Sequence, residues 1–182
     1  LSSSSAASDV YKRQVQHLQL GADENGKLRG LVHEVIAQTS RFEDFTEHVA
    51  EWSGMLYHCD HVRLAYRLAP LDVYTPLDMR APGAATGVYA LESAMDELAW
   101  AAGVDPVQLR LTNYAETNQN EGKPYSSKEL RACYQQGADA FGWSKRSPQP
   151  RSMREGDQLI GYGMATGAVS YTHLRAHETG RN

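Results

Sequence analysis

One segment, residues 88–102, constrains the fold more than any other part of the sequence. Its apolar side chains recur at intervals of three and four residues, the period of one face of an α-helix. They are Val88, Leu91, Met95, Leu98 and Ala102. Glu92, Asp96 and Glu97 lie elsewhere around this helix, and Gly103 marks its end. A stripe of this kind has to be buried, so the chain must build a packed core around the helix.

A run of small residues leads into this helix: Met79-Arg80-Ala81-Pro82-Gly83-Ala84-Ala85-Thr86-Gly87. Its glycines allow the backbone to approach a ligand closely, and the helix start presents free N–H groups. A helix N-terminus contributes about 0.3–1 kcal/mol toward an anion, or about 2 kcal/mol when buried. A large cofactor would therefore also need Arg80 and contacts from elsewhere. The spacing alone allows either one wall of an anion site or a connection that only turns the chain.

The residues before this run predict strands. Residues 15–39 alternate around an Asp23-Glu24-Asn25-Gly26 turn, which indicates a β-hairpin. On its second strand, Leu28, Val32 and Ile36 are expected to share a face. Residues 40–54 are expected to form a loop with a helical turn, and residues 61–71 to form a strand that ends near Pro70.

Two shorter helices and a last strand are expected after the long helix. Asp105-Pro106 is typical of an N-cap followed by a first-turn proline. Ser126 and Glu129 have the spacing of a capping box, ahead of a helix that ends at Gly142. The buried stripe predicted for this last helix consists of Leu130, Cys133, Tyr134, Ala138 and Phe141. Residues 158–165 are expected to form a strand.

The ends of the 182-residue chain differ from the middle. Residues 1–14 contain a serine run without apolar periodicity, and residues 169–182 turn abruptly polar. Both segments resemble translated adapter or vector sequence, although ordinary disordered tails would have the same composition. We expect residues 1–14 and 169–182 to be disordered and non-native, and residues 15–168 to form the folded part.

Charge and composition exclude several classes of function. Lys and Arg number 18 against 22 Asp and Glu, a net charge of −4, so we expect no nucleic-acid partner. No apolar run approaches the roughly 18 residues of a membrane span, so we expect no membrane partner. Cys59 and Cys133 are the two cysteines of the sequence, too few for a disulfide framework or a cysteine-rich metal site. We expect both to be small core thiols.

Other candidate sites are weaker. His58, Cys59 and His61 could suggest zinc, but strand alternation would send the first two to opposite faces. His33-Glu34 lacks the second histidine of a zinc-protease helix, and His173 with His177 lacks its glutamate. The glycines of residues 161–167 have the wrong spacing for a dinucleotide fingerprint.

Two longer stretches carry a family resemblance: MRAPGAATGVYALESAMDELAWAAGVDPVQLRLTNY and GKPYSSKELRACYQQGADAFGW. In this order they resemble the molybdopterin-binding large subunit of the xanthine dehydrogenase and aldehyde oxidase family, most of all bacterial aldehyde oxidoreductases. The resemblance runs from about Val15 to Ala168. Such subunits are several times longer, so the chain resembles an internal fragment. The resemblance implies an α+β fold: part of the molybdopterin-binding domain, with a β-hairpin and further strands packed with three helices.

The resemblance also implies a site. Met79, Arg80 and Ala81 correspond to the turn beside the molybdenum centre, without direct ligation of the metal by a side chain. Pro82 lies in the substrate pocket where xanthine-oxidising relatives carry phenylalanine, and Gly54 lies where they carry an arginine that orients the substrate. Both departures favour an aldehyde over a purine. The catalytic glutamate of the family lies outside this fragment, so no residue here is assigned that role.

The implied reaction is the oxidation of aldehydes, or of related carbonyl or N-heterocyclic substrates, with water as the oxygen source. Electrons would pass to iron–sulfur clusters and FAD on partner subunits or domains. The implied partners are the remainder of the large subunit and the iron–sulfur and FAD subunits; the compartment, cytoplasmic or periplasmic, stays open. The alternative is a non-catalytic anion-binding α+β module that uses Arg63, Arg67 and Arg80. The fragment should leave large apolar faces uncovered, whereas such a module should not.

Overall fold

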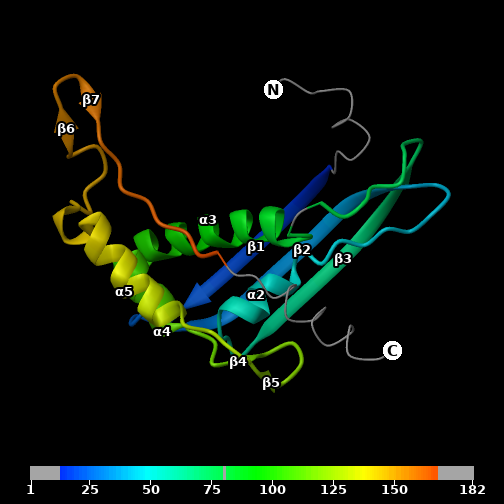
Figure 1. Ribbon diagram of the computed structural model, residues 1–182, viewed down its shortest axis with the longest axis horizontal. Coiled ribbons are helices and arrows are strands. Elements are labelled where there is room, and N and C mark those ends of the chain that lie inside the picture. The colour runs from blue at the N-terminus through cyan, green and yellow to red at the C-terminus, as the bar shows by residue number, and fades with distance from the viewer. Residues whose placement is uncertain (1–12, 80, 168–182) are drawn as a thin grey trace.

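The computed structural model describes residues 13–79 and 81–167. They form an α+β fold, as predicted, with one three-stranded sheet in the order β1-β2-β3 (Figure 1). Helices α2 and α3 pack on this sheet, and α4 and α5 follow at one end of it. The largest apolar core lies between the sheet and the helices and includes Leu31, Leu56, Leu91, Met95 and Leu109. No helix of the described segments is long and apolar enough to cross a membrane.

The predicted hairpin is confirmed. β1 (Gln14–Ala22) pairs antiparallel with β2 (Leu28–Ser40). The turn between them is closed by Asp23, whose Oδ1 accepts hydrogen bonds of 3.0 Å from the backbone N–H groups of Asn25 and Lys27. Gly26 supplies the positive φ of 77° that the turn requires.

A β-bulge changes which side chains of β2 face the core. Gly21 pairs with Gly30 but Ala22 pairs with Leu28, so Arg29 is an extra residue in β2. Beyond it the buried positions include Leu31 and Val35, whereas Ile36 is 47% exposed on the other face. The expectation that Leu28, Val32 and Ile36 share a face is wrong, because the bulge shifts the alternation by one residue.

The strand predicted over residues 61–71 is also confirmed. β3 (Val62–Leu71) pairs parallel with β2, from Leu31 opposite Val62 to Ser40 opposite Leu71. The connection between the two strands contains the predicted helical turn as α2 (Glu51–Leu56), which extends past Gly54. Parallel neighbours need a crossover of this kind.

The long helix α3 spans Ala84–Ala102, so it begins inside the small-residue run. Leu91 and Met95 are fully buried, Val88 and Leu98 are partly buried, and Gly103 ends the helix with a φ of 66°. These findings confirm the predicted stripe. The carboxylate of Glu92 is buried as well, which the sequence did not indicate.

Both helices predicted after α3 are present, but the cap and the buried stripe predicted for the second one are not. Asp105 caps α4 (Pro106–Thr112) by accepting hydrogen bonds from Val107 and Gln108. α5 (Leu130–Phe141) has no side-chain cap, so the predicted capping box is absent, and it is followed by the 3₁₀ turn η1 (Trp143–Lys145). Of its predicted stripe only Tyr134 is buried, whereas Phe141 is 60% exposed.

The cysteine expectation is half right. Cys59 is buried, but Cys133 is exposed, because no described segment covers this side of α5.

The remaining strands are short. β4 (Thr117–Asn118) pairs with β5 (Lys123–Pro124), and β6 (Arg154–Glu155) pairs with β7 (Gln158–Leu159). The strand predicted over residues 158–165 is therefore wrong beyond Leu159. The segment 160–167 instead runs without strand pairing from β7 toward α2 and α3 (Figure 1).

The predicted boundaries at residues 14 and 169 stay predictions. β1 already begins at Gln14, within the segment expected to be disordered. The other predictions for the ends, including those for His173 and His177, concern residues outside the described ones.

Candidate functional site

The bend at the start of α3 is the site that the sequence predicted. Met79 is 53% exposed, Pro82 is half-buried, and Arg80 lies outside the described residues. Ala81 has a positive φ of 57°, a conformation that residues with a Cβ rarely adopt. Its carbonyl accepts a hydrogen bond of 3.1 Å from the Ala84 N–H and so closes the first turn. Such strain is held in place by surrounding structure and is common at ligand sites.

The two glycines of the bend pack against the protein's own backbone. A Cβ on Gly83 would lie 2.3 Å from the His48 carbonyl oxygen, and one on Gly87 would lie 2.1 Å from that of Val49. The segment of His48 and Val49 thus lies directly against the start of α3. The sequence led us to expect that these glycines let a ligand approach the backbone. The geometry does not favour this, because the His48–Val49 loop occupies the space beside them.

Two features leave the start of α3 open to a polar group. No side chain caps its first turn at Gly83. The buried hydroxyl Oγ1 of Thr86 has no hydrogen-bond partner among the described residues. An uncapped helix start fits a negatively charged group such as a phosphate, and the unpartnered hydroxyl could hydrogen-bond to it. Two surface hollows of the described residues, of about 610 and 150 Å³, are lined by other segments than the bend.

A buried chain of hydrogen bonds reaches the same turn from the sheet. His33 of β2 is fully buried; its Nδ1 lies 2.8 Å from Ser53 Oγ and its Nε2 lies 2.9 Å from Gln16 Oε1. Gln16 Nε2 donates to the backbone carbonyl of Thr86 at 3.1 Å. Burial lowers the pKa of His33 from 6.5 to about 4, so its imidazole is neutral at physiological pH. His33 thus lies within the second strand of the predicted hairpin.

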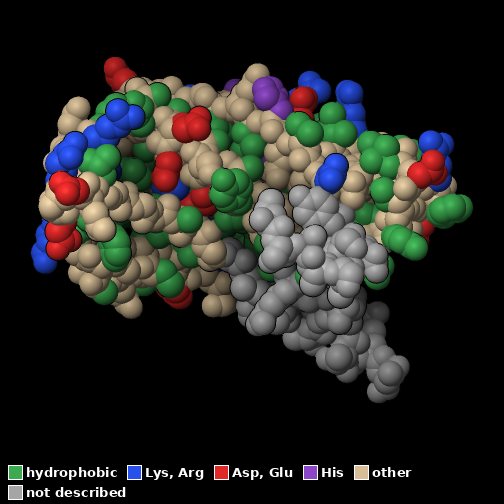
Figure 2. Space-filling view, turned by 90° about the horizontal axis from the view of Figure 1, so that it is seen from above, with side chains coloured by type: hydrophobic (Ala, Val, Ile, Leu, Met, Phe, Trp, Pro, Cys, Tyr) green, Lys and Arg blue, Asp and Glu red, His purple; other side chains and the backbone are tan. Residues whose placement is uncertain are grey.

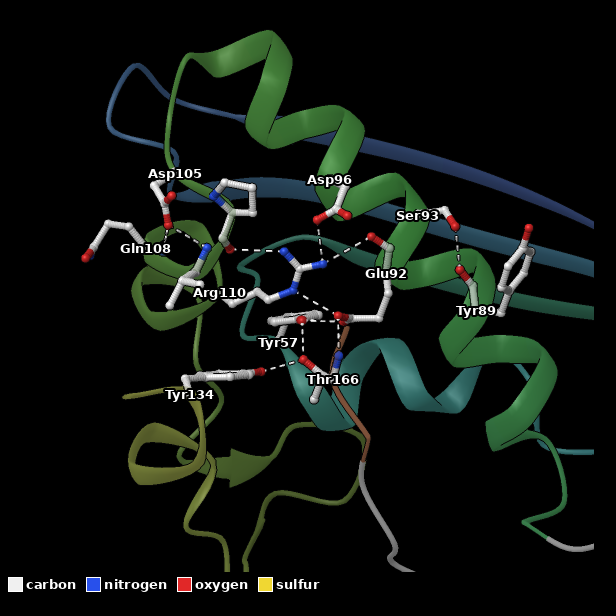
Figure 3. Close-up of polar contacts among 12 residues, drawn as sticks. Tyr57, Tyr89, Glu92, Ser93, Asp96, Asp105, Gln108, Arg110, Tyr134 and Thr166 are labelled. Carbon is white, nitrogen blue, oxygen red and sulfur yellow. Dashed lines mark hydrogen bonds and ion pairs between the residues drawn. The ribbon is translucent and has the colours of Figure 1, made fainter. Parts of the chain in front are cut away.

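A second buried network centres on Glu92 and Arg110 (Figure 3). Arg110 Nε donates to Glu92 Oε2 at 2.8 Å, and Nη2 pairs with Asp96 Oδ1 at 2.8 Å. Arg110 Nη1 also donates to the Pro106 carbonyl at 3.0 Å. Burial alone would lower the pKa of Arg110, but the neighbouring negative charges outweigh it and raise that pKa. Arg110 therefore keeps its proton, and its contacts with Glu92 and Asp96 join α3 to α4.

The network extends to the segment before residue 168. Thr166 N–H donates to Glu92 Oε2 at 2.6 Å, and the Tyr57 hydroxyl donates to Glu92 Oε1. Because the single Tyr57 proton is used there, Thr166 donates to Tyr57 at 3.1 Å and Tyr134 donates to Thr166 at 2.6 Å. Burial, with the charge of Glu92, raises the pKa of Tyr57, so its hydroxyl keeps its proton.

Glu92 is therefore a structural residue. Both of its carboxylate oxygens are engaged by the protein, which leaves no free basic oxygen to remove a proton from a substrate. Its side chain is 4% exposed, which excludes a role at the surface. Sequence reasoning missed the pairing with Arg110, because the two residues lie on different helices. One available signal was that Glu92, a charged residue, directly follows Leu91 of the apolar stripe.

The structure gives little support to the weaker candidates for a metal site. Cys59 Sγ donates to the His61 carbonyl at 3.4 Å, and His58 pairs with Asp60 at 3.5 Å. Within residues 13–79 and 81–167, no three His, Cys, Asp or Glu side chains are grouped to hold a metal ion.

The anion-binding alternative also gains little. Arg63 pairs with Glu34 at 3.0 Å, which offsets its charge. On the face shown in Figure 2, basic and acidic side chains are interspersed rather than gathered into a basic patch.

Comparison with known proteins gives a consistent set of similarities. The model of the molybdopterin cofactor-binding domain family matches residues 3–114. Over 157 residues the chain is 40% identical to the aldehyde oxidoreductase molybdenum-binding subunit PaoC of Escherichia coli K12, covering 84% of this chain. Over 161 residues it is 32% identical to the putative xanthine dehydrogenase molybdenum-binding subunit XdhA of the same strain, covering 85% of this chain. The chain spans 21% of the length of each relative.

Solved structures share the fold. The aldehyde oxidoreductase of Desulfovibrio gigas aligns with a TM-score of 0.63 at 18% identity, over 72% of this chain and 15% of that one. The quinoline 2-oxidoreductase of Pseudomonas putida 86 aligns with a TM-score of 0.63 at 16% identity, over 73% of this chain and 18% of that one.

Proposed function

Because the chain belongs to the molybdopterin cofactor-binding domain family, we propose that it forms part of the catalytic subunit of a molybdenum hydroxylase that oxidises aldehydes. One observation supports this most directly: the 40% identity to an aldehyde oxidoreductase molybdenum-binding subunit over 157 residues. We further propose that the remainder of such a subunit, together with iron–sulfur and FAD subunits, are its partners.

We assign cofactor contact to Met79, Arg80 and Ala81, and a wall of the substrate pocket to Pro82. When bound, the molybdenum cofactor supplies the redox chemistry and the transfer of oxygen derived from water. The chain's own share is to bind and orient that group. The Arg80 guanidinium, the uncapped first turn of α3 and the Thr86 hydroxyl offer positive charge and hydrogen-bond donors to it.

The side chain of Pro82 makes the aldehyde assignment specific. A phenylalanine at this position would offer a flat ring for stacking on a purine, whereas proline offers a small aliphatic surface. Proton abstraction from the attacking oxygen is assigned to a group outside this chain, because Glu92 is fully engaged. We therefore expect the purified 182-residue chain to show no aldehyde oxidation in a dye-reduction assay, and measurable turnover would contradict this assignment.

A chimeric subunit tests the proposal. The matched 157-residue segment of the Escherichia coli PaoC subunit would be replaced by its counterpart from this chain and produced with the other subunits of that enzyme. We expect the chimera to contain molybdenum and to oxidise aldehydes in preference to a purine. An assembled chimera that binds no molybdenum would refute the cofactor assignment. One that binds molybdenum but prefers the purine would refute the substrate assignment.

An arginine variant sharpens this test. Arg80→Ala in the chimera should lower molybdenum content or aldehyde turnover at least about tenfold, as expected for loss of a charge-assisted contact. Arg67→Ala, on an exposed position of β3, is the matched control and should change neither.

A further inference from the structure

The hydrogen-bond chain of Ser53, His33 and Gln16 does more than fill the core. We propose that it is a positioning relay that fixes the first turn of α3 and, through it, the bend at Ala81–Gly83. Its link to the cofactor rests on the function proposed above. Its mechanical part, the control of the bend by residues of β1, β2 and α2, can be tested without any cofactor.

The direction of each hydrogen bond in the relay follows from its partners. Gln16 must turn its NH₂ group toward the Thr86 carbonyl, since a carbonyl accepts and cannot donate. Gln16 Oε1 is then left to face His33, so His33 Nε2 carries the proton and donates. The unprotonated Nδ1 accepts from the Ser53 hydroxyl. A neutral imidazole of this single tautomer completes the relay, and every polar atom of the imidazole is satisfied.

The relay and the His48–Val49 segment both contact the first turn of α3. The carbonyls of His48 and Val49 lie against Gly83 and Gly87, and Gln16 Nε2 donates to the carbonyl of Thr86 between them. The first turn of α3 thus has two separate supports. Ala81 belongs to the same unit, because its carbonyl binds the Ala84 N–H and its positive φ needs outside support.

A series of buried hydrogen bonds also restricts the relative positions of the joined elements more tightly than apolar contacts do. Apolar side chains tolerate small sliding movements, whereas a hydrogen bond loses strength within a few tenths of an ångström and about 30° of misalignment. A fully satisfied buried network therefore specifies one arrangement of the elements that it joins. Here those elements are α2, β2, β1 and the start of α3, the element that carries the proposed cofactor residues.

Two glutamines of β1 provide a matched experiment. Gln16 faces the core and Gln19 is exposed on the other face of the same strand. Gln16→Glu keeps the acceptor for His33 but removes the donor to Thr86, and Gln16→Leu removes both. Gln19→Glu and Gln19→Leu make the same changes of charge and shape away from the relay.

Amide hydrogen exchange in the 182-residue chain is the first measurement. The amides of residues 84–87 should exchange about tenfold faster in both Gln16 variants and at the normal rate in both Gln19 variants. Nitrogen-15 NMR of His33 should show a single Nε2-protonated tautomer in the unaltered chain and in the Gln19 variants, and a mixture in Gln16→Leu. Equal exchange rates in the Gln16 and Gln19 variants would overturn the relay, whatever the chain's function.

Molybdenum content of the chimera is the second measurement. Gln16→Glu and Gln16→Leu should lower it, whereas the Gln19 variants should retain it. Full retention in Gln16 variants whose first turn exchanges faster would overturn the link between relay and cofactor. A chimera without molybdenum before any substitution would refute the proposed function instead, and the exchange data would still decide the relay.

Discussion

Two helices with similar apolar patterns end in different surroundings. In the sheet region, which comprises β1–β3 with α2, α3 and α4, the stripe of α3 is sealed and Leu91 is fully buried. In the α5 region, which comprises α5, η1, β6 and β7, only Tyr134 of the α5 stripe is buried. An apolar period predicts a helix and a face, but the burial of that face depends on which other elements are present to cover it.

The α5 region is held mainly by polar anchors. Tyr134 binds Thr166, Trp143 Nε1 donates to Asp105 Oδ2 at 3.0 Å, and Arg131 pairs with Glu116 at 2.6 Å. Phe141 is 60% exposed although its ring contacts that of Tyr162, and Cys133 is exposed too. Both fit a surface that another part of a larger subunit would cover. The sheet region should therefore dominate the stability of the chain. The substitutions below test that difference.

The largest expected loss comes from the centre of the sheet region. Arg110→Ala would leave the buried carboxylate of Glu92 without its ionic partner and should lower the free energy of unfolding by about 3–5 kcal/mol. Arg131→Ala removes an exposed ion pair with Glu116 and a cation–π contact with Tyr114, and it should cost about 1–2 kcal/mol. Urea denaturation measures both. Similar losses for the two variants would remove the distinction between the regions.

A second pair compares the two apolar stripes directly. Leu91→Ala opens a cavity in the sealed core and should cost about 2–5 kcal/mol. Phe141→Ala, at a side chain that is 60% exposed, should change stability by less than about 1 kcal/mol. The midpoint of thermal unfolding provides the readout. A loss at Phe141 as large as that at Leu91 would show that α5 is packed in solution.

The pH dependence of stability sharpens the comparison inside the sheet region. The unfolded pKa of His33 is near 6.5 and the folded one is about 4, so between these values the unfolded chain binds the additional proton. The contribution of neutral His33 to the free energy of unfolding is therefore fully present above pH 6.5, and it is lost as the pH falls toward 4. It amounts to about 3 kcal/mol, at 1.36 kcal/mol for each pKa unit.

Urea denaturation at pH 7.0, 5.5 and 4.5 would check this effect. The stability difference between the unaltered chain and His33→Gln should shrink as the pH falls, because the variant has no imidazole to protonate. His58→Gln, at an exposed histidine, is the control for the substitution itself and should change the stability at pH 7.0 by less than about 1 kcal/mol. A pH-independent difference for His33→Gln would contradict the depressed pKa.

The smallest effect is expected where the two regions meet. Thr166→Val keeps the shape of the side chain but removes the hydroxyl that links Tyr134 to Tyr57, at a cost of about 1–2 kcal/mol. Faster hydrogen exchange should be confined to α5 and residues 160–167. If α3 and α4 loosen to the same degree, the hydroxyl supports the sheet region rather than the junction.

The elements were predictable where a local signal defined them. The Asn-Gly turn, the Asp105-Pro106 cap and Gly103 each fix a local backbone geometry, and each appears where predicted. Which side chains of β2 face the core was not predictable, because the bulge at Arg29 depends on how β1 pairs with β2. The burial of α5 was not predictable either, because no pattern within a helix reports whether a partner covers it.

The candidate site shows the same division. The sequence indicated the bend ahead of α3, but not that Gly83 and Gly87 would be used to admit the His48–Val49 loop. It also did not indicate the relay through His33, because Gln16, Ser53 and Thr86 lie on three further elements. Contacts between residues far apart in the sequence leave no mark on the local spacing of any one of them.

The position of Thr166 bears on the order in which the chain assembles. It completes the hydrogen bonding of Glu92, which precedes it by 74 residues. At roughly 5–20 residues per second, a ribosome takes about 4–15 s to make that stretch. During this interval the nascent α3 and α4 display a carboxylate whose final partner has not yet been made. Formation of the complete network around Glu92 therefore waits for the synthesis of residue 166, and it is limited by the pace of translation rather than by the intrinsic speed of helix formation.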